Sequence, residues 1–598
     1  MSTSFAISGP YPGLQYIPAS PEPSGVYHED REINGALWRV YNATFDGSQW
    51  SYSGGALAGN AFAFIQNVDG STSFKTYSGP TPWEPDDWVG SGNHTVFNAA
   101  DYGMIPGGDP VVNTAALQAA IRGAAAAGGG RVFIPAAVYP VLGTITVPAT
   151  QDGTTSTPAV GIVIEGSSGS TQLAQQATTT TNTFSLTGDN DEKGVVFRNL
   201  RISYATPQMC PGSWAVYSTL QDVICEDCYF EDCPGAMYMG GLRNGLASCT
   251  IFFDVDDHPN TEGQTMVYMA GPDDFVDLCY IYQKTVHGGG PIECVGIQVA
   301  SASEPRVTDT NIVDFDYGIQ VTGSSTNLIH GLFSNLACEC NVTAVLIQPG
   351  GPDANIYELF FVNCIFERTR YSVSATPGIY VDVYRAGGAA GDPDTVSDIG
   401  FANCMSHDWA GPAMQIGSGQ DIIVTGGRYG QSATDDSMAT SGAIAVTGTA
   451  VRVTIVGADC SAQIPAYMSQ PSPMNPQPYS LSVTGVVTQM QVRSCNLSGN
   501  AHGALYVSPH GADLRVSDCD DYNDQNTPVA ALPPTLIPQN AASLGYYGPS
   551  LITFSNPTTI MVTLSSVTYS MGFCCIPLQP TDEVQFSATP TKFTWLGK

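Results

Sequence analysis

The chain has 598 residues, in which 53 acidic side chains outnumber 20 basic ones and give a formal net charge of −33 at pH 7. This charge repels phosphate backbones, so we expect no nucleic-acid partner. No run of roughly 18 apolar residues occurs, and the N-terminus lacks the basic and apolar regions of a secretion signal. We therefore expect no signal peptide, no transmembrane segment and no membrane insertion.

Residues 1–97 open the chain with short segments that are rich in aromatic and β-branched residues, at 38–41, 50–52, 61–64 and 74–77. Such segments are typical of strands. A stretch rich in glycine and proline follows at 79–91. The sequence therefore predicts a small β-rich module with a linker over residues 1–97.

An alanine-rich helix is predicted directly after this module. Asn113 or Thr114 has the side chain of an N-cap, and the apolar residues that follow recur at helical spacing. They are Leu117, Ala120, Ile121 and Ala124. The glycines at 128–130 end the helix, and an apolar strand comes next. A solenoid exposes an unpaired edge at its first rung, and we expect this helix to cover that edge.

A short corner pattern then recurs from residue 197 to residue 519. An apolar residue is followed by two spacers, the second usually Asn or Asp, then by a Cys or small apolar residue. Steps between copies run from 21 to 40 residues. A repeat of this size is typical of a solenoid. The fourth positions are Leu200, Cys228, Cys249, Cys279, Ile312, Leu336, Cys364, Cys404, Gly427, Cys460, Cys495 and Cys519.

The spacing within the repeat indicates which solenoid it is. Strand side chains alternate faces with period two, but here the inward residues lie three apart across the Asn. A strand must therefore end at the Asn, which tolerates left-handed backbone, and a new strand begins. A third apolar stretch follows each corner. We predict an all-β chain whose residues 98–535 form a parallel β-helix with three strands per rung.

Sixteen cysteines at first suggest a disulfide framework. Nine of them fall at inward or corner positions of successive rungs, where Cys behaves as a small buried hydrophobe. We therefore predict reduced, stacked thiols. Cys225, Cys228 and Cys233 lack the second pair of ligands that a zinc site needs, so we expect no metal and no cofactor. The nine are Cys225, Cys228, Cys249, Cys279, Cys364, Cys404, Cys460, Cys495 and Cys519.

The last part of the chain, residues 536–598, again alternates as short strands and predicts a small antiparallel sandwich. Segments at 551–554, 560–564, 573–576, 584–586 and 593–595 are the expected strands.

Two segments resemble known families. Asp101-Tyr-Gly103, the helix of residues 113–122, the glycines at 128–130 and the apolar strand ending at Pro135 closely resemble the opening of the pectate-lyase-like superfamily. This resemblance implies a right-handed parallel β-helix with a capping helix. Where that family usually has an acidic turn, this chain has Gly-Gly-Asp-Pro-Val-Val-Asn at 107–113. We therefore expect no acidic metal-binding loop there.

Residues 546–598, with the turn at 580–584, resemble the C-terminal module of actinobacteriophage minor tail proteins. An N-terminal anchor, a capped β-helix and a C-terminal β-module together resemble a phage tailspike or tail fibre. This resemblance implies a virion location, a homotrimer, a host surface polysaccharide as ligand, and contacts with other phage tail or baseplate proteins through the N-terminal region.

Cleavage of a glycosidic bond needs two carboxylates, about 5–5.5 Å apart for retention or about 6.5–9.5 Å apart for inversion. Neighbouring rungs stack about 4.8 Å apart and can supply both. The catalytic candidates are Asp254, Asp256, Asp257, Asp314, Asp316, Glu367 and Asp408, and the substrate-binding candidates are Trp409, His407, Tyr317 and Arg368. We expect the carboxylates to point away from the core, whereas for Trp409 and Tyr317 ordinary packing is a simpler reading than a sugar platform. In so acidic a chain, a solvated stripe of carboxylates without catalytic function is the simpler reading.

The chemistry and the setting stay open at this point. The ordered motif set of polygalacturonases is absent, since the fragments at 286–288 and 501–503 lack their partners. The two main hypotheses are a phage spike that binds, and possibly cleaves, a surface polysaccharide, and a bacterial pectate-lyase-like or glycoside-hydrolase enzyme. A purely structural β-helix is the third. Residue patterns alone do not decide between hydrolase and lyase.

Overall fold

A computed structural model describes the chain at residues 96–147, 161–187, 193–254, 263–284, 293–300, 303–323, 330–351, 353–368, 376–384, 395–430, 432, 440–462, 477–507 and 512–520, with further strands between 28 and 77 and between 550 and 596. The chain divides into two compact units, residues 1–97 with 127–131, and residues 98–126 with 132–598. Each is described by itself.

The N-terminal unit contains an antiparallel sheet with the strand order β1-β2-β5-β6, and a separate two-stranded hairpin. The sheet strands are β1 (His28–Ile33), β2 (Ala36–Tyr41), β5 (Ala61–Gln66) and β6 (Thr72–Tyr77), and the hairpin strands are β3 (Ala43–Phe45) and β4 (Trp50–Tyr52).

The C-terminal strands form two antiparallel sheets of three strands each. One holds β45 (Ser550–Phe554), β48 (Cys575–Leu578) and β50 (Phe593–Leu596), and the other holds β46 (Ile560–Leu564), β47 (Val567–Met571) and β49 (Glu583–Phe586).

The predicted helix is present as α1 (Pro110–Ala126), but its start was predicted wrongly. Asp109 is the N-cap, because its Oδ1 accepts hydrogen bonds from the N–H groups of Val111 and Val112 at 2.8 and 3.1 Å. Asn113 lies inside the helix and is fully buried. Its side chain accepts from the Ile105 N–H and donates to the Ile105 and Pro140 carbonyls.

Helix α1 packs against the first strands of the solenoid with the face that the sequence predicts, since Leu117, Ala120, Ile121 and Ala124 are all fully buried. Two polar side chains join it to the backbone beside β9 (Ala137–Val141) and at β10 (Ile145–Thr146). Thr114 Oγ1 accepts from the Leu142 N–H at 2.8 Å, and Gln118 Oε1 accepts from the Thr146 N–H at 2.8 Å.

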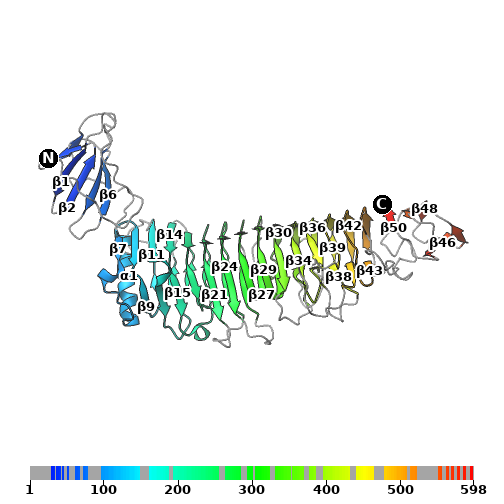
Figure 1. The fold of residues 1–598 in the computed structure, drawn as a ribbon, viewed down its shortest axis with the longest axis horizontal. Coiled ribbons are helices and arrows are strands. Elements are labelled where there is room, and N and C mark those ends of the chain that lie inside the picture. Colours follow the sequence, from blue (N-terminus) through cyan, green and yellow to red (C-terminus); the bar gives the residue numbers. More distant parts are fainter. Residues whose placement is uncertain are drawn as a thin grey trace. The chain divides into compact units, whose positions relative to one another are not determined.

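The body of the molecule is a parallel β-helix built from a 16-stranded and a 22-stranded sheet, and this confirms the predicted fold. The pairing registers sort its strands into three columns, which we call face 1, face 2 and face 3. Face 1 is the 16-stranded sheet and runs along the upper edge in Figure 1, whereas face 2 lies in front. The handedness of the solenoid stays a prediction.

Face 1 begins with β7 (Val96–Asn98), β8 (Gly130–Ile134) and β11 (Ile162–Gly166). It continues with β14 (Lys193–Arg198), β17 (Gln221–Glu226), β20 (Gly245–Ala247), β23 (Phe275–Asp277), β26 (Arg306–Thr308), β28 (Leu332–Ser334), β30 (Ile356–Val362), β33 (Val396–Ala402), β36 (Gly419–Thr425), β39 (Ala450–Val451), β40 (Thr454–Val456), β42 (Val487–Arg493) and β44 (Ala512–Ser517).

Face 2 consists of β9, β12 (Thr171–Gln175), β15 (Arg201–Tyr204), β18 (Tyr229–Glu231), β21 (Thr250–Asp254), β24 (Tyr280–Lys284), the first halves of β27 (Asn311–Val321) and β29 (Ala337–Ile347), β31 (Ile365–Arg368), β34 (Met405–His407) and β37 (Arg428–Gly430).

Face 3 consists of β10, β13 (Phe184–Leu186), β16 (Val216–Ser218), β19 (Met237–Met239), β22 (Thr265–Met269), β25 (Val295–Val299), the second halves of β27 and β29, β32 (Ile379–Val381), β35 (Met414–Ile416), β38 (Gly442–Val446), β41 (Tyr479–Val483) and β43 (Gly503–Val507).

The corner between face 1 and face 2 has the left-handed backbone that the sequence predicts. The corner residues have φ values between 48° and 55°, and glycine takes the same place at Gly426 and Gly457. The following residue turns inward and is buried in all these rungs except at Gly427 and Cys519, and it is often Cys. The non-glycine corner residues are Asn199, Asp227, Ser248, Leu278, Asp309, Asn335, Asn363, Asn403, Ser494 and Asp518.

Two members of the predicted inward series are misplaced by two residues. Asn311 pairs with Tyr280, which follows Cys279, so the equivalent position is Thr310 and not Ile312. Asp459 pairs with Arg428, so the equivalent position in that rung is Ala458 and not Cys460. All four side chains are buried. A shift of two keeps a strand residue on the same face, which is why the pattern tolerated the error.

The cysteines behave as predicted, since all those that the structure describes are free thiols, and all except Cys519 are buried. Burial raises the pKa of Cys228, Cys249 and Cys338 well above the usual thiol value, so these groups stay protonated. Aromatic rings stack in the same interior, with Phe361 lying 4.5 Å from Phe333 and 5.0 Å from Phe401 between ring centroids.

Candidate functional site

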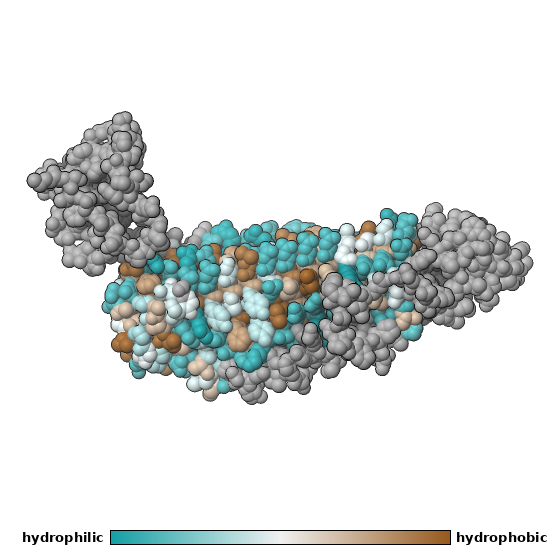
Figure 2. All heavy atoms as spheres, in the orientation of Figure 1, coloured by the Kyte–Doolittle hydropathy of each residue, from teal (hydrophilic) through white to brown (hydrophobic). Residues whose placement is uncertain are grey.

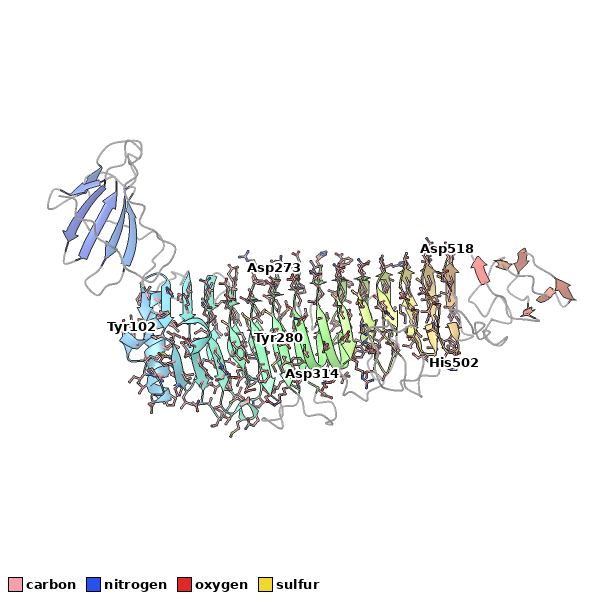
Figure 3. The ribbon with its side chains drawn as sticks, in the orientation of Figure 1. Tyr102, Asp273, Tyr280, Asp314, His502 and Asp518 are labelled. Carbon is pink, nitrogen blue, oxygen red and sulfur yellow. The ribbon has the colours of Figure 1, made fainter. Side chains whose placement is uncertain are left out.

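The register of face 2 brings side chains from successive rungs into one column, and all its members except the last, His407, reach the surface. It pairs Glu231 with Phe252, Phe252 with Tyr282, Tyr282 with Val313, Val313 with Glu339, Glu339 with Glu367, and Glu367 with His407. Figure 2 shows this side of the solenoid as a mosaic of hydrophilic and apolar residues, and Figure 3 places Tyr280 on it with Asp314 nearer its lower edge.

Three of the predicted site residues meet at the later end of this column. His407, the last residue of β34, is buried with 2% of its side chain exposed, and it lies between two carboxylates. Its Nε2 is 3.1 Å from Glu367 Oε1 on β31, and its Nδ1 is 2.9 Å from Asp408 Oδ2. Glu367 is 31% exposed and Asp408 is 23% exposed, so both carboxylates reach the surface.

The His407 imidazole is a cation at neutral pH. Burial alone would lower the pKa of His407, but contacts with Asp408 and Glu367 outweigh it and raise the pKa to about 9. Asp408 holds its place because it adopts the left-handed conformation, with φ 66°. A buried, charged histidine thereby fixes the orientation of two surface carboxylates.

Glu339 adds a further carboxylate that the sequence analysis missed. It is exposed on β29 and is in register with Glu367 on the neighbouring strand. Neighbouring strands lie about 4.8 Å apart, close to the separation of about 5–5.5 Å in retaining glycosidases. We call Glu339, Glu367, His407 and Asp408 the carboxylate cluster. In the sequence Glu339 looks like any solvated strand residue, and only the register with Glu367 distinguishes it.

Asp254 lies on the same face but far from the carboxylate cluster. It is five strands away from His407, or about 24 Å at the usual strand spacing. Only 6% of the residue is exposed. Its Oδ2 is 2.7 Å from Lys284 Nζ, which is in register on β24. Asp254 is therefore a buried carboxylate that pairs with the exposed Lys284, and the prediction that it points into solvent is wrong.

Asp314 and Asp316 lie between Asp254 and the carboxylate cluster, at an irregularity in β27. The register with β29 shifts on either side of Phe315, and Asp314 has a φ of 66°. Asp314 is half-buried. Asp316 is 2% exposed, and its Oδ2 accepts a hydrogen bond from the Glu293 N–H at 2.6 Å. Asp316 therefore supports the backbone, contrary to the expected outward position.

The predicted substrate-binding residues also differ in how far they are exposed. Trp409 is 1% exposed, because the left-handed corner at Asp408 directs it inward. Its indole covers Gly378, where a Cβ would lie 2.2 Å from Nε1. In this position no sugar can stack on it. Tyr317 is half-buried, and burial raises its pKa. Arg368 is half-buried at the end of β31.

Asp256 and Asp257 lie outside the described residues. Within the described part of the chain, no group of three or more His, Cys, Asp or Glu side chains is arranged to hold a metal ion.

Aromatic side chains gather on face 3 rather than beside the carboxylate cluster. Tyr217, Tyr238 and Tyr268 are in register, and the Tyr238 ring stacks on the other two at centroid distances of 4.6 and 5.2 Å. Trp214 meets Tyr238 edge-on at 5.7 Å. Because the three tyrosine rings cover one another's faces, mainly their edges remain accessible to a ligand. This tyrosine stack therefore serves chiefly as packing between neighbouring rungs.

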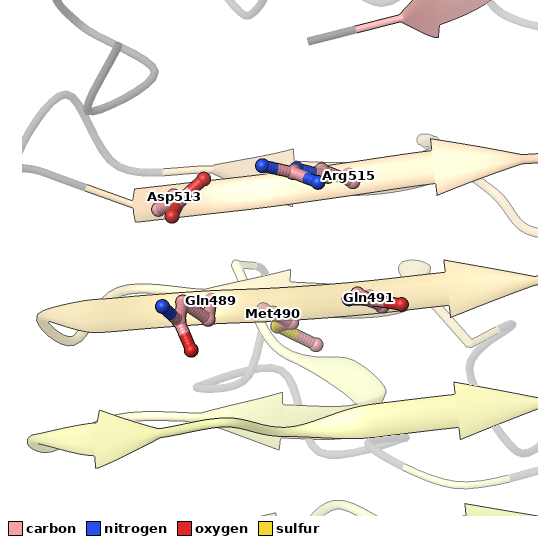
Figure 4. A pocket seen from close by; sticks show the side chains of 5 residues that line it. All are labelled: Gln489, Met490, Gln491, Asp513 and Arg515. Carbon is pink, nitrogen blue, oxygen red and sulfur yellow. The ribbon is translucent and has the colours of Figure 1, made fainter. Parts of the chain in front are cut away.

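A shallow polar depression of about 270 Å³ lies near the last rungs of face 1. Gln489, Met490 and Gln491 on β42 and Asp513 and Arg515 on β44 line it (Figure 4). It lies on a different face from the carboxylate cluster and holds no pair of carboxylates.

The fold is similar to that of solved β-helix proteins. Tailspike protein 3 of bacteriophage CBA120 aligns with a TM-score of 0.51 at 12% identity over 72% of this chain, and the chain spans 62% of that protein's length. A tailspike mutant of E. coli bacteriophage HK620, in complex with a pentasaccharide, aligns at 11% identity over 83% of this chain and 92% of its own, with a TM-score of 0.49. The A-module of the Azotobacter vinelandii mannuronan C-5 epimerase AlgE4 aligns at 14% identity over 72% of this chain and 99% of its own, with a TM-score of 0.42.

No sequence-family description matches the chain, and no curated protein matches it. Among the described residues, no helix is long and apolar enough to cross a membrane. At such low identity the structural similarity shows the fold alone. The chain is a parallel β-helix protein whose structural neighbours include phage tailspike proteins.

Proposed function

We propose that this chain is a phage tailspike that binds a polysaccharide of the host surface and cleaves it at the carboxylate cluster. The observation that carries the proposal is the pair Glu339 and Glu367, two carboxylates in register on adjacent strands of an accessible face. A buried imidazolium at His407 holds the second of them in place. In this proposal the chain is a homotrimer in the virion, and residues 1–97 contact other tail or baseplate proteins.

The spacing favours hydrolysis with a covalent intermediate. One carboxyl donates its proton to the departing sugar oxygen while the other bonds to the anomeric carbon. Water then replaces the enzyme at that carbon and returns its proton to the first carboxylate. We assign the bonding role to Glu367, because His407 fixes its orientation, and the proton-donating role to the more exposed Glu339.

The test uses purified bacterial capsular polysaccharides and O-antigens, with release of reducing ends as the measurement. We expect Glu339→Gln and Glu367→Gln each to lower the rate about 10²–10⁴-fold, since each removes a group that transfers a proton or forms a bond. Glu304→Gln is the matched control, because Glu304 is an exposed glutamate at the corner before face 1. Full activity in both cluster variants would place the site elsewhere.

The same assay separates the alternatives. Products with an unsaturated sugar end, detected by ultraviolet absorbance, would indicate a lyase of the pectate-lyase-like kind and contradict the hydrolytic role of the two glutamates. Retention of a polysaccharide on the immobilised protein without any cleavage would limit the function to binding. In that case we expect the two Gln variants to weaken binding by about 1–2 kcal/mol each.

A further inference from the structure

Face 1 carries one outward column that is mostly apolar, beside a second outward column with polar and charged members such as Arg198, Glu226 and Asp277. Its strands read as continuous apolar runs, such as residues 195–197, 223–225, 359–361 and 422–424. The middle residue of each run points outward, and pairing places these residues in one column. We call Val196, Ile224, Phe275, Leu332, Phe360 and Ile423 the outer row.

The outer row is accessible in the single chain. Leu332, Phe360 and Ile423 are 39%, 48% and 46% exposed, and the other three members are half-buried. Arg306 interrupts the row between Phe275 and Leu332.

Two glycines make the outer row more continuous. Gly245 and Gly400 occupy positions in the same column, each beside a phenylalanine of the row. The Phe275 ring lies over Gly245, where a Cβ would be 2.3 Å from it, and the Phe360 ring lies over Gly400, where a Cβ would be 2.7 Å away. The rings therefore cover rungs that have no side chain of their own.

Parallel sheets are normally covered on both surfaces, and a long exposed apolar strip marks a contact surface. The corresponding outward column of face 3 is mixed, since Tyr217, Tyr238 and Tyr268 are followed by Gln298 and Gln320. The outer row thus distinguishes face 1 as the surface on which a partner packs.

We propose that the partner is a second copy of this chain, and that copies associate in parallel with face 1 turned toward a common axis. From β14 to β36 the outer row has one position per rung, at intervals of one strand spacing. A partner that covers the whole row must therefore present contacts at the same interval over the same length. A symmetric assembly about an axis along the solenoid meets this condition, since it brings the same rung of each copy to the same height.

Charge along the edges of face 1 is compatible with such a contact. A net charge of −33 opposes self-association, but both edges carry pairs that are neutralised within the chain. At the end of the strands, Arg198 pairs with Glu226. At the start, Arg243 Nε is 2.7 Å from Asp222 Oδ1, and the same type of pair joins Arg452 and Asp421.

The outer row also ends at a defined rung. Beyond Ile423 the same column continues as Thr454, Gln491 and Arg515, and the last two line the polar depression of Figure 4. The apolar contact between copies is therefore expected from β14 to β36, and not at the last rungs of the solenoid.

Single cysteines on the full chain test this arrangement. Phe360→Cys and Ile423→Cys place thiols on the outer row, and Ile365→Cys places one on face 2, where Ile365 is 40% exposed. With a short bifunctional maleimide we expect covalent oligomers from the first two variants and none beyond the wild-type background from the third. All described native cysteines except Cys519 are buried, so that background should be low.

The inference rests on the proposal that the chain self-associates, but not on the glycan site. Light scattering of the wild type at tens of micromolar should give a multiple of the 62.9 kDa chain mass, and a monomer would overturn both proposals. An oligomer that cross-links through Ile365→Cys and not through the outer row would overturn the assignment of face 1 alone. Phe360→Ser combined with Ile423→Ser should weaken assembly, whereas Ile365→Ser should not.

Discussion

Left-handed corners are the residue-scale feature that the sequence predicts best. Asn, Asp and Gly fill most of these positions because they tolerate positive φ, and the inward residue follows directly. The inward residue after the corner was harder to assign in some rungs. In the rung of Asp309, the apolar Ile312 lies two positions beyond Thr310 and imitates the expected inward residue, and only strand pairing assigns the position to Thr310.

The corner at Leu278 gives a direct test of this reading. Leu278 has a φ of 53° and is 60% exposed, so its side chain offsets little of the cost of the left-handed backbone. We expect Leu278→Asn to raise the free energy of unfolding by about 1 kcal/mol, measured by thermal denaturation. The reverse change at an equivalent corner, Asn363→Leu, should lower it by a similar amount. Equal stability of all three proteins would contradict the role of the corner.

The carboxylate cluster should make stability depend on pH. The pKa of His407 is about 9 in the folded protein against 6.5 for an ordinary histidine. Its stabilising contribution is therefore complete below about pH 6.5 and is lost as the pH rises through about 9. We expect the melting temperature of the wild type to fall toward that of His407→Gln over this range. A constant difference between the two proteins would show that His407 is neutral when folded.

At the scale of elements, helix α1 shows what a sequence pattern can and cannot fix. The periodicity of Leu117, Ala120, Ile121 and Ala124 identifies the buried face correctly. The start was missed because residues 107–113 were read as a turn, although Pro110 is well suited to the first helical position. Asn113 serves instead to satisfy partly buried backbone groups of Ile105 and Pro140.

Two substitutions in this helix should have different costs. Asp109→Ala removes the N-cap and should lower stability by about 1 kcal/mol. Asn113→Ala should lower stability more, because it leaves one N–H and two carbonyls, all partly buried, without their side-chain partner. Asp101→Ala, in the short turn before the helix, is a control. Chemical denaturation can rank the three variants, and a smaller loss for Asn113→Ala than for Asp109→Ala would contradict this account.

Site prediction from sequence succeeded only in part, for a reason that also lies at this scale. Residues next to corners are acidic throughout the chain, and the sequence does not say which of them turn inward. Asp254 and Asp316 are buried in local contacts, and Trp409 is directed into the core. Glu339 became a candidate only when the register placed it beside Glu367. Proximity across rungs, and not residue type, distinguishes the carboxylate cluster.

At the scale of the whole molecule, the repeat length and its parity were sufficient to predict a parallel β-helix. The extent of face 1 was not predictable in the same way. Its outward apolar row looks like ordinary core residues in the sequence, because each member lies next to inward apolar residues in a continuous apolar run. Only the alternation of burial along each strand shows which of those residues face out.

Truncation tests whether folding and polysaccharide cleavage depend on the N-terminal residues. Strand β7 (Val96–Asn98) is the first strand of the 16-stranded sheet, so a deletion must stop short of it. We expect removal of residues 1–94 to leave the β-helix folded and polysaccharide cleavage unchanged, while the truncated chain no longer assembles onto phage particles. Circular dichroism, the reducing-end assay and in vitro assembly with tail particles measure the three effects. Loss of the folded solenoid would show that it needs residues 1–94.

The most direct measurement for the central claim is a cryo-electron microscopy structure of Glu367→Gln with a bound fragment of its polysaccharide. This variant should retain the glycan because it loses the bond-forming carboxylate and keeps the rest of the surface. We predict sugar density across face 2 over β29, β31 and β34, with a glycosidic oxygen beside Glu339. Density confined to another face, or to the N-terminal or C-terminal strands, would contradict the account.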